Sequence, residues 1–175
     1  MIQEGDYLYE KDEKLGGWIV KVADKNKEKY QPIPSTKDGL PVVSLAGAFA
    51  LCHKMTESPK IPYRVKDLSY AFTGCISLKY GPKIPSRVRY MEGAFQDCTA
   101  LEEDMWINAN PARYDRCFAG TKKEIYLNGT SRKLYELALT ADNHNVFDAT
   151  AGHYADEDVD FLRADEWDKH LYDDD

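Results

Sequence analysis

The sequence predicts a repeat solenoid of about four 23-residue units, with a β-hairpin cap at its N-terminal end and a helical cap at its C-terminal end. Three observations support this prediction. An Ala-Phe pair recurs every 23 residues, a Cys follows each of the first three Phe residues by three positions, and an Ile recurs further along each unit. A unit this short cannot bury its own apolar side, so it stacks on its neighbours.

The repeat consists of apolar or small positions that stay in phase along the chain. The pairs are Ala48-Phe49, Ala71-Phe72, Ala94-Phe95 and the variant Cys117-Phe118. The other sets are Cys52, Cys75 and Cys98; Leu45, Leu68 and Met91; Met55, Leu78 and Leu101; Ile61, Ile84 and Ile107; and Val42, Val65 and Val88. We therefore expect each set to form a row of side chains inside the stack.

The period of the repeat indicates the class of solenoid, because 23 residues lies within the range of α/β leucine-rich repeats. The pattern Val-x-x-Leu/Met-x-x-Ala-Phe-x-x-Cys-x-x-Leu, followed by Ile-Pro, resembles the BspA-like bacterial leucine-rich repeats between about Leu40 and Phe147. Ile107 to Ala138 resembles the closing unit of such arrays, with a strand and a helix. The resemblance implies a recognition scaffold without catalytic residues, of bacterial or phage origin, that binds protein or glycan ligands at a surface.

The segments around the repeat divide the chain into four parts. Residues 1–39 are expected to form the N-terminal β cap and its connector, because Asp6 to Lys25 holds two β-rich stretches that favour a hairpin. Residues 40–130 form the predicted solenoid. Residues 131–150 form the predicted C-terminal cap of helix and strand, with apolar residues at helical spacing in Ser131 to Thr140 and Ser131 or Thr130 as its N-cap.

The last part of the chain, residues 151–175, is an acidic segment with an apolar stripe. Asp156 to Asp175 holds ten acidic and two basic residues, a net charge of −8, which leaves +1 for the first 155 residues. Phe161 and Trp167 would share one face of a helix. Three readings stay open: a helix packed on the solenoid, a segment that docks into a partner through Phe161 and Trp167, or disorder.

The four cysteines are expected to be reduced core residues. Cys52, Cys75 and Cys98 are 23 residues apart, unlike the close pairs of zinc sites, and free Cys behaves as a small buried hydrophobe. Cys117 occupies the Ala position and has the same interpretation. No phosphate-binding loop, nucleophile elbow or metal-ligand spacing is present, so we expect no catalytic residues, no metal, no cofactor and no enzyme activity.

The composition limits the kinds of partner. A nearly neutral body lacks the basic excess of a nucleic-acid binder, and no run of 18 apolar residues predicts a membrane span. No secretory signal is visible at the N-terminus, which favours a cytoplasmic or virion-associated protein over a secreted one.

The expected function is therefore protein binding through residues that face outward between the repeated positions. Tyr63, Tyr80 and Trp106 are the candidate anchors there, because exposed aromatic residues flanked by charges are common in binding sites. Two alternatives remain: a phage-encoded virion component or inhibitor whose acidic segment docks on a basic partner, or a carbohydrate-binding adhesin in which these three rings stack on sugars. Self-association through open ends of the stack is also possible.

Overall fold

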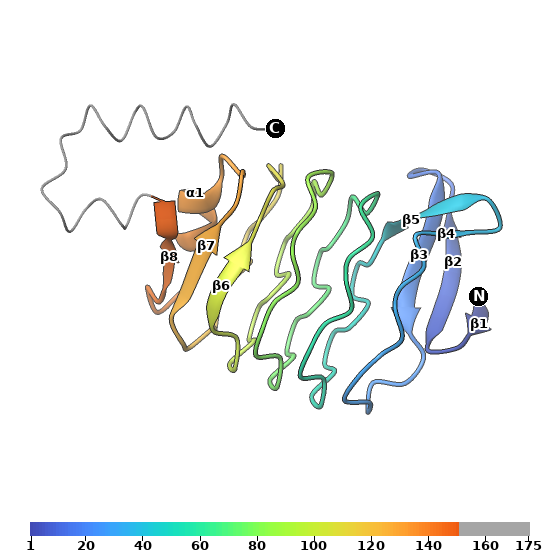
Figure 1. Cartoon of the computed structure of the whole chain (residues 1–175), viewed down its shortest axis with the longest axis horizontal. Helices are drawn as coiled ribbons and strands as arrows, with labels where there is room; N and C mark the ends of the chain where they lie inside the picture. Colours follow the sequence, from blue (N-terminus) through green and yellow to red (C-terminus); the bar gives the residue numbers. More distant parts are fainter. Residues whose placement is uncertain (151–175) are drawn as a thin grey trace, which may run out of the picture.

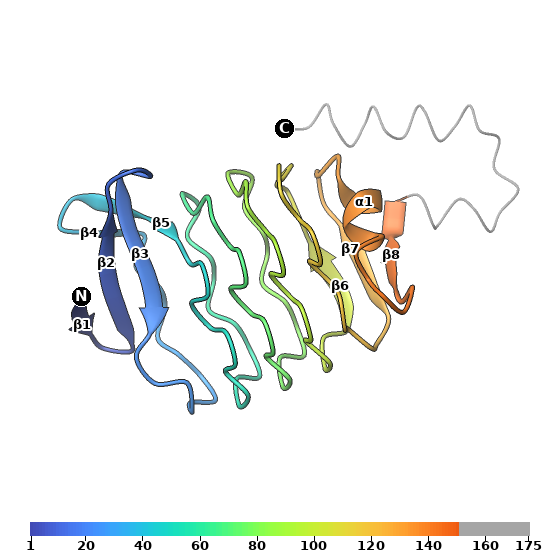
Figure 2. The same ribbon diagram turned by 180° about the vertical axis from the view of Figure 1, so that it is seen from behind.

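The computed structural model of the protein describes residues 1–150. Within them the backbone makes successive coils that lie side by side between an N-terminal and a C-terminal sheet (Figure 1). The view from behind shows the same order (Figure 2). One continuous apolar core runs through the coils, from Tyr7 in the N-terminal sheet to Val146 in the C-terminal sheet.

The N-terminal sheet is curled and mixed, with the strand order β1-β2-β3-β5-β4. Its strands are β1 (Ile2–Glu4), β2 (Tyr7–Asp12), β3 (Gly17–Val22), β4 (Thr36–Lys37) and β5 (Leu40–Ser44). β2 pairs antiparallel with β3, and β3 pairs parallel with β5. Because side chains alternate along a strand, Tyr7 and Tyr9 of β2 point into the core while Glu10 is exposed. The pairing of β3 with β5 joins the first two strands to the coils.

Hydrogen bonds between equivalent positions join each coil to the next. The amides of Phe49, Phe72 and Phe95 donate to carbonyl oxygens 22 residues further on, at 2.8–2.9 Å. In the other direction, the amides of Lys66 and Arg89 donate to carbonyl oxygens 23 residues earlier, at 2.8 Å. Between β5 and β6 these contacts form only isolated bridges, so the middle coils consist mainly of turns.

The repeated Phe residues form a buried row through the core. The rings of Phe49, Phe72, Phe95 and Phe118 are stacked, with successive centroids 5.3, 5.3 and 5.5 Å apart. All four are fully buried. Cys52, Cys75, Cys98 and Cys117 are free and buried, which confirms the prediction of reduced core cysteines.

Each coil contains two positions where the backbone lies in the left-handed region. The first set is Gly47, Tyr70, Gly93 and Arg116, with φ of 64°, 54°, 57° and 58°. The second set is Leu51, Gly74, Asp97 and Gly120, with φ of 62°, 71°, 60° and 75°. Left-handed backbone is unfavourable for residues with a Cβ, so glycine is expected at such positions. Tyr70, Leu51 and Asp97 instead lie over the glycine of the next coil.

The C-terminal sheet is small and parallel, with the order β6-β7-β8. It consists of β6 (Glu103–Trp106), β7 (Ile125–Asn128) and β8 (Val146–Asp148). The five-residue helix α1 (Leu134–Ala138) packs on it and buries Leu134, Leu137 and Ala138.

The predicted fold class is wrong. The described chain is mostly β, with a curled mixed sheet and a small parallel sheet, and it is not an α/β leucine-rich-repeat solenoid with a helical cap. A helix requires an unbroken run of right-handed residues, and the left-handed positions interrupt every coil. At residues 131–140 the helix has only five residues, and its N-cap is Lys133, without a side-chain cap, rather than Ser131 or Thr130.

Candidate binding surfaces

The outer side of the C-terminal sheet carries three exposed aromatic side chains. Side chains alternate along its strands, so Met105, Leu127 and Val146 enter the core while Trp106, Tyr126 and Phe147 point outward. Trp106 is 49% exposed, Phe147 39% and Tyr126 38%. We call these three residues the aromatic face.

Strand pairing fixes the relative positions within the aromatic face. Tyr126 of β7 is paired with Asp104 of β6 and Phe147 of β8, and Trp106 is paired with Asn128. The rings of Tyr126 and Phe147 are stacked, with centroids 5.6 Å apart. The face is therefore held by neighbouring backbone strands and by ring contact.

Hydrogen-bonding groups surround the aromatic face. The Asn128 amide donates to Asp104 Oδ1 at 3.0 Å, and the Tyr126 hydroxyl donates to Glu124 Oε2 at 2.6 Å. The hydrogen bond to Glu124 raises the pKa of Tyr126, because it stabilises the protonated phenol beside a carboxylate. The Tyr126 hydroxyl therefore stays protonated at neutral pH.

Tyr80 lies on the coil next to β6. The bridge between Ile84 and Ile107 places the segment 80–84 alongside β6, and the Tyr80 side chain is 46% exposed. Lys79 lies over the Tyr80 ring, with its Nζ 5.3 Å from the ring centroid. Tyr80 is thus an exposed aromatic residue on the coil adjacent to β6.

Tyr63 lies in a different setting, between two arginines. The Arg64 Nε donates to the Tyr63 hydroxyl at 2.9 Å, and the guanidinium carbons of Arg64 and Arg87 are 5.6 and 5.5 Å from the ring centroid. Cations over an aromatic face are attracted by the ring quadrupole. The Tyr63 ring therefore helps to hold the Arg87 guanidinium in place, although about half of the Tyr63 side chain is exposed.

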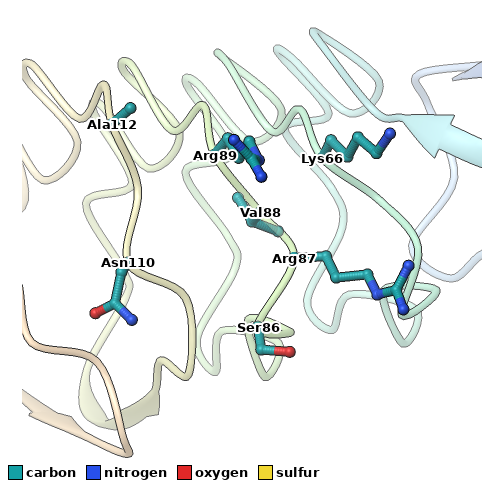
Figure 3. A pocket seen from close by; sticks show the side chains of 7 residues that line it. All are labelled: Lys66, Ser86, Arg87, Val88, Arg89, Asn110 and Ala112. Carbon is teal, nitrogen blue, oxygen red and sulfur yellow. The ribbon is translucent and has the colours of Figure 1, made fainter.

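Arg87 lines a hollow of about 500 Å³ on the middle coils, which we call the basic groove (Figure 3). Hydrogen bonds from Arg89 N to Lys66 O and from Ala112 N to Arg89 O align three successive coils, so Lys66, Arg89 and Ala112 follow one another along it. The complete lining is Lys66, Ser86, Arg87, Val88, Arg89, Asn110 and Ala112.

The three cations of the basic groove form no ion pair within residues 1–150. No carboxylate lines the groove, and the ion pairs of the described chain do not include Lys66, Arg87 or Arg89. By contrast, Arg113 on the neighbouring coil pairs with Glu92 at 3.6 Å. The groove thus presents positive charge that no carboxylate of the described part neutralises.

The buried cysteines are poorly suited to nucleophilic chemistry. Burial raises the pKa of the Cys75 thiol to about 12 and raises the pKa of Cys98 and Cys117 as well. The thiols of Cys75 and Cys98 also donate to backbone oxygens of Phe49 and Phe72 at 3.0 Å. Because the thiolate is the reactive form, these thiols are expected to be inert in the folded protein.

The structure brings together only part of the predicted site. Tyr80 and Trp106 lie on neighbouring strand segments, whereas Tyr63 contacts the arginines of the basic groove. Phe161 and Trp167 lie outside the described residues.

Sequence reasoning missed Tyr126 and Phe147, although the alternation of apolar and polar residues in 124–128 indicates an outward Tyr126. The basic groove was also missed, although Lys66 and Arg89 are 23 residues apart and so occupy equivalent positions of two units.

Residues 1–150 contain no group of three or more His, Cys, Asp or Glu side chains placed to hold a metal ion. In the same part of the chain, no helix has the length and apolar character needed to cross a membrane.

Comparison with known proteins gives no match to this chain among family models, curated proteins or solved structures. The resemblance to BspA-like proteins therefore stays a prediction from the sequence.

Proposed function

We propose that this chain is a non-catalytic module that binds another protein through its aromatic face. The observation that carries the proposal is the outward position of Trp106, Tyr126 and Phe147 on three adjacent parallel strands. The inward side chains of the same strands are buried, so the sheet is fixed in the core while its outer side remains open to solvent.

Aromatic side chains are a favourable basis for such a contact. Trp and Tyr are enriched among the residues that dominate binding energies, because they bury a large area with few rotatable bonds. Tyr126 and Phe147 are already stacked on each other, so little conformational freedom remains to be lost on binding. The aromatic face therefore has both the residue types and the rigidity of a protein-binding surface.

The charges around the aromatic face indicate the chemistry of the partner. Glu103, Asp104 and Glu124 are exposed close to the rings. Glu102 is neutralised by Lys79 and Lys123, at 3.3 and 3.4 Å, but no lysine or arginine of the described chain pairs with the other three carboxylates. The matching partner surface has an apolar centre with Lys or Arg at its rim.

The proposal can be tested by selecting a displayed random-peptide library against the full chain. We expect enriched peptides that combine apolar and basic residues. Their binding should be lost with Trp106→Ala and reduced with Tyr126→Ala. Tyr135→Ala is the matched control, because Tyr135 is an exposed aromatic residue on α1 outside the aromatic face.

Two results would contradict protein binding by this face. In the first, the selected peptides bind Trp106→Ala as tightly as the wild type. In the second, no peptide is enriched but a glycan array gives a signal that Trp106→Ala abolishes, which would support the carbohydrate alternative. The hydrogen-bonded Asn128 and Asp104 beside Trp106 are groups that a sugar hydroxyl can also use.

A further inference from the structure

We propose that the basic groove binds the acidic segment 156–175 of the same chain. The proposal is independent of the aromatic face. It assigns an occupant to a hollow that Lys66, Arg87 and Arg89 line together and in which none of the three makes an ion pair with residues 1–150.

Charge complementarity is the first argument. The segment 156–175 carries ten acidic and two basic residues, and the first 155 residues sum to +1. The positive charge of the groove is therefore local, and the chain's own largest concentration of negative charge follows the described part directly. Arginine forms strong paired hydrogen bonds with carboxylates, so Arg87 and Arg89 suit an acidic peptide.

The construction of the groove is the second argument. Arg87 lies over the Tyr63 ring, and Lys66 and Arg89 are on coils joined by a backbone hydrogen bond of 2.8 Å. The three cations are thus positioned by the fold itself. Asn110, with its amide, and Ser86, with its hydroxyl, add polar groups that can donate to further carboxylates.

The position of the groove relative to the C-terminal end is the third argument. Asn110 of the groove accepts a hydrogen bond from the backbone of Arg132 at 2.6 Å, and residue 132 lies in the stretch that leads into α1 and β8. One end of the groove therefore borders the last coil of the described chain. Neighbouring strands are about 4.8 Å apart, and a residue of extended chain spans about 3.3–3.6 Å. Residues 151–155 are thus long enough to lead the acidic segment across a few coils.

Carbodiimide cross-linking of the full chain tests this proposal, since it joins a lysine amine directly to a carboxylate in contact with it. In dilute, low-salt solution we expect mass spectrometry to find amide links between Lys66 and the carboxylates of 156–175. Lys60 and Lys83 serve as internal controls, because they are exposed lysines that do not line the groove. The Lys66 links should be several-fold more abundant than theirs, and they should decrease in 1 M salt, where the screening length is only about 3 Å.

Matched variants distinguish binding of the segment in the groove from a general attraction due to the net charge of the protein. Arg87→Glu combined with Arg89→Glu should reduce the Lys66 links several-fold. Lys14→Glu combined with Lys21→Glu makes the same change in net charge at exposed positions of the hairpin and should leave the links unchanged. Thermal unfolding of each variant shows that the comparison is made between folded proteins.

Three outcomes would overturn the proposal. The first is equal linking of Lys66, Lys60 and Lys83 to the segment. The second is Lys66 linking that does not change in the Arg87→Glu and Arg89→Glu variant. The third uses an equal mixture of ¹⁴N and ¹⁵N protein: if about half of the Lys66 links join a ¹⁴N chain to a ¹⁵N chain, as random pairing requires, the occupant is the segment of a second copy and not of the same chain.

Discussion

The Tyr70 ring covers Gly93 on the next coil, and a Cβ at Gly93 would come within 2.5 Å of that ring. Both residues have left-handed backbone, with φ of 54° and 57°. The absence of a side chain at one position therefore makes room for the side chain at the equivalent position 23 residues earlier.

This relationship predicts that Gly93→Ala is more destabilising than Gly47→Ala. The two glycines are equivalent in the repeat and have similar φ, 57° and 64°, but a Cβ at Gly47 meets nothing within 4 Å. Gly47→Ala should cost about 1–2 kcal/mol, from backbone strain alone. Gly93→Ala should cost more, because it also displaces the Tyr70 ring.

Urea unfolding measures the free energy of unfolding of both variants. When Tyr70 is also replaced by glycine, Gly93→Ala and Gly47→Ala should lower the free energy of unfolding by the same amount within about 0.5 kcal/mol. A difference that persists would show that the Tyr70 ring does not cause the larger effect of Gly93→Ala.

The stacked Phe row makes Phe72 a second test position. Phe72→Ala leaves a cavity between Phe49 and Phe95, whose rings are each stacked on it, and should reduce the free energy of unfolding by about 3–5 kcal/mol. Ile76→Ala in the same coil is the control, with an expected change within about 0.5 kcal/mol because Ile76 is about half exposed. Equal effects of the two substitutions would mean that the row does not support the core.

The buried thiols predict very slow reaction with a thiol reagent such as dithionitrobenzoate. All four cysteines are buried and burial raises their pKa values, so the native protein should react only as it unfolds. In denaturant all four should react at once. Ser35→Cys places a thiol at an exposed position outside the basic groove and should add one fast-reacting group to the native protein. Rapid native reaction of the wild type would argue against the buried row.

Alkaline pH should destabilise the protein. Burial raises the pKa of the four cysteines and of Tyr7 and Tyr30. In the unfolded state the cysteines lose their protons above about pH 8.5 and the two tyrosines above about pH 10, in each case before they do so in the folded state. The unfolded state then binds fewer protons, and the free energy of unfolding falls as pH rises. Each group contributes at most about 1.4 kcal/mol per pH unit.

Denaturant unfolding between pH 7 and pH 10 measures this slope. Cys75→Ala removes one of the titrating groups and should make the decrease shallower. Tyr135→Phe removes an exposed tyrosine and should leave the slope unchanged. A stability that stays constant up to pH 10 in the wild type would contradict the effect.

The interior of the protein was easier to predict than its architecture. The in-phase Phe positions do share one core, because equivalent side chains at a fixed spacing must find equivalent surroundings in adjacent coils. The secondary structure was mispredicted because it depends on the backbone at Tyr70 and Arg116. Both residues have left-handed backbone, a conformation expected for glycine. Their residue types therefore do not predict it.

The outward-facing aromatic residues were predicted only where one strand segment carries the signal. The sequence predicts that Trp106 faces outward, because it lies between charged and repeated residues. In the structure its side chain is exposed. Phe147 joins Tyr126 only through the parallel pairing of β7 with β8, which local sequence does not specify. The charges of the basic groove come from separate coils and become neighbours only when the coils are in register.

Most hydrogen bonds between coils join residues 22 or 23 positions apart, and this spacing also restricts how the length of this chain can change. A single inserted residue inside a coil would change the spacing of every hydrogen-bonded pair that spans the insertion, and the strand segments on either side of it would no longer face both adjacent coils in register. Loss of a whole unit would shorten the stack by one coil and gain of a unit would lengthen it by one coil. In both cases the hydrogen-bond donors and acceptors of adjacent coils would stay aligned. Homologous chains should therefore differ in size by multiples of a complete unit, with smaller insertions confined to the tips of the turns.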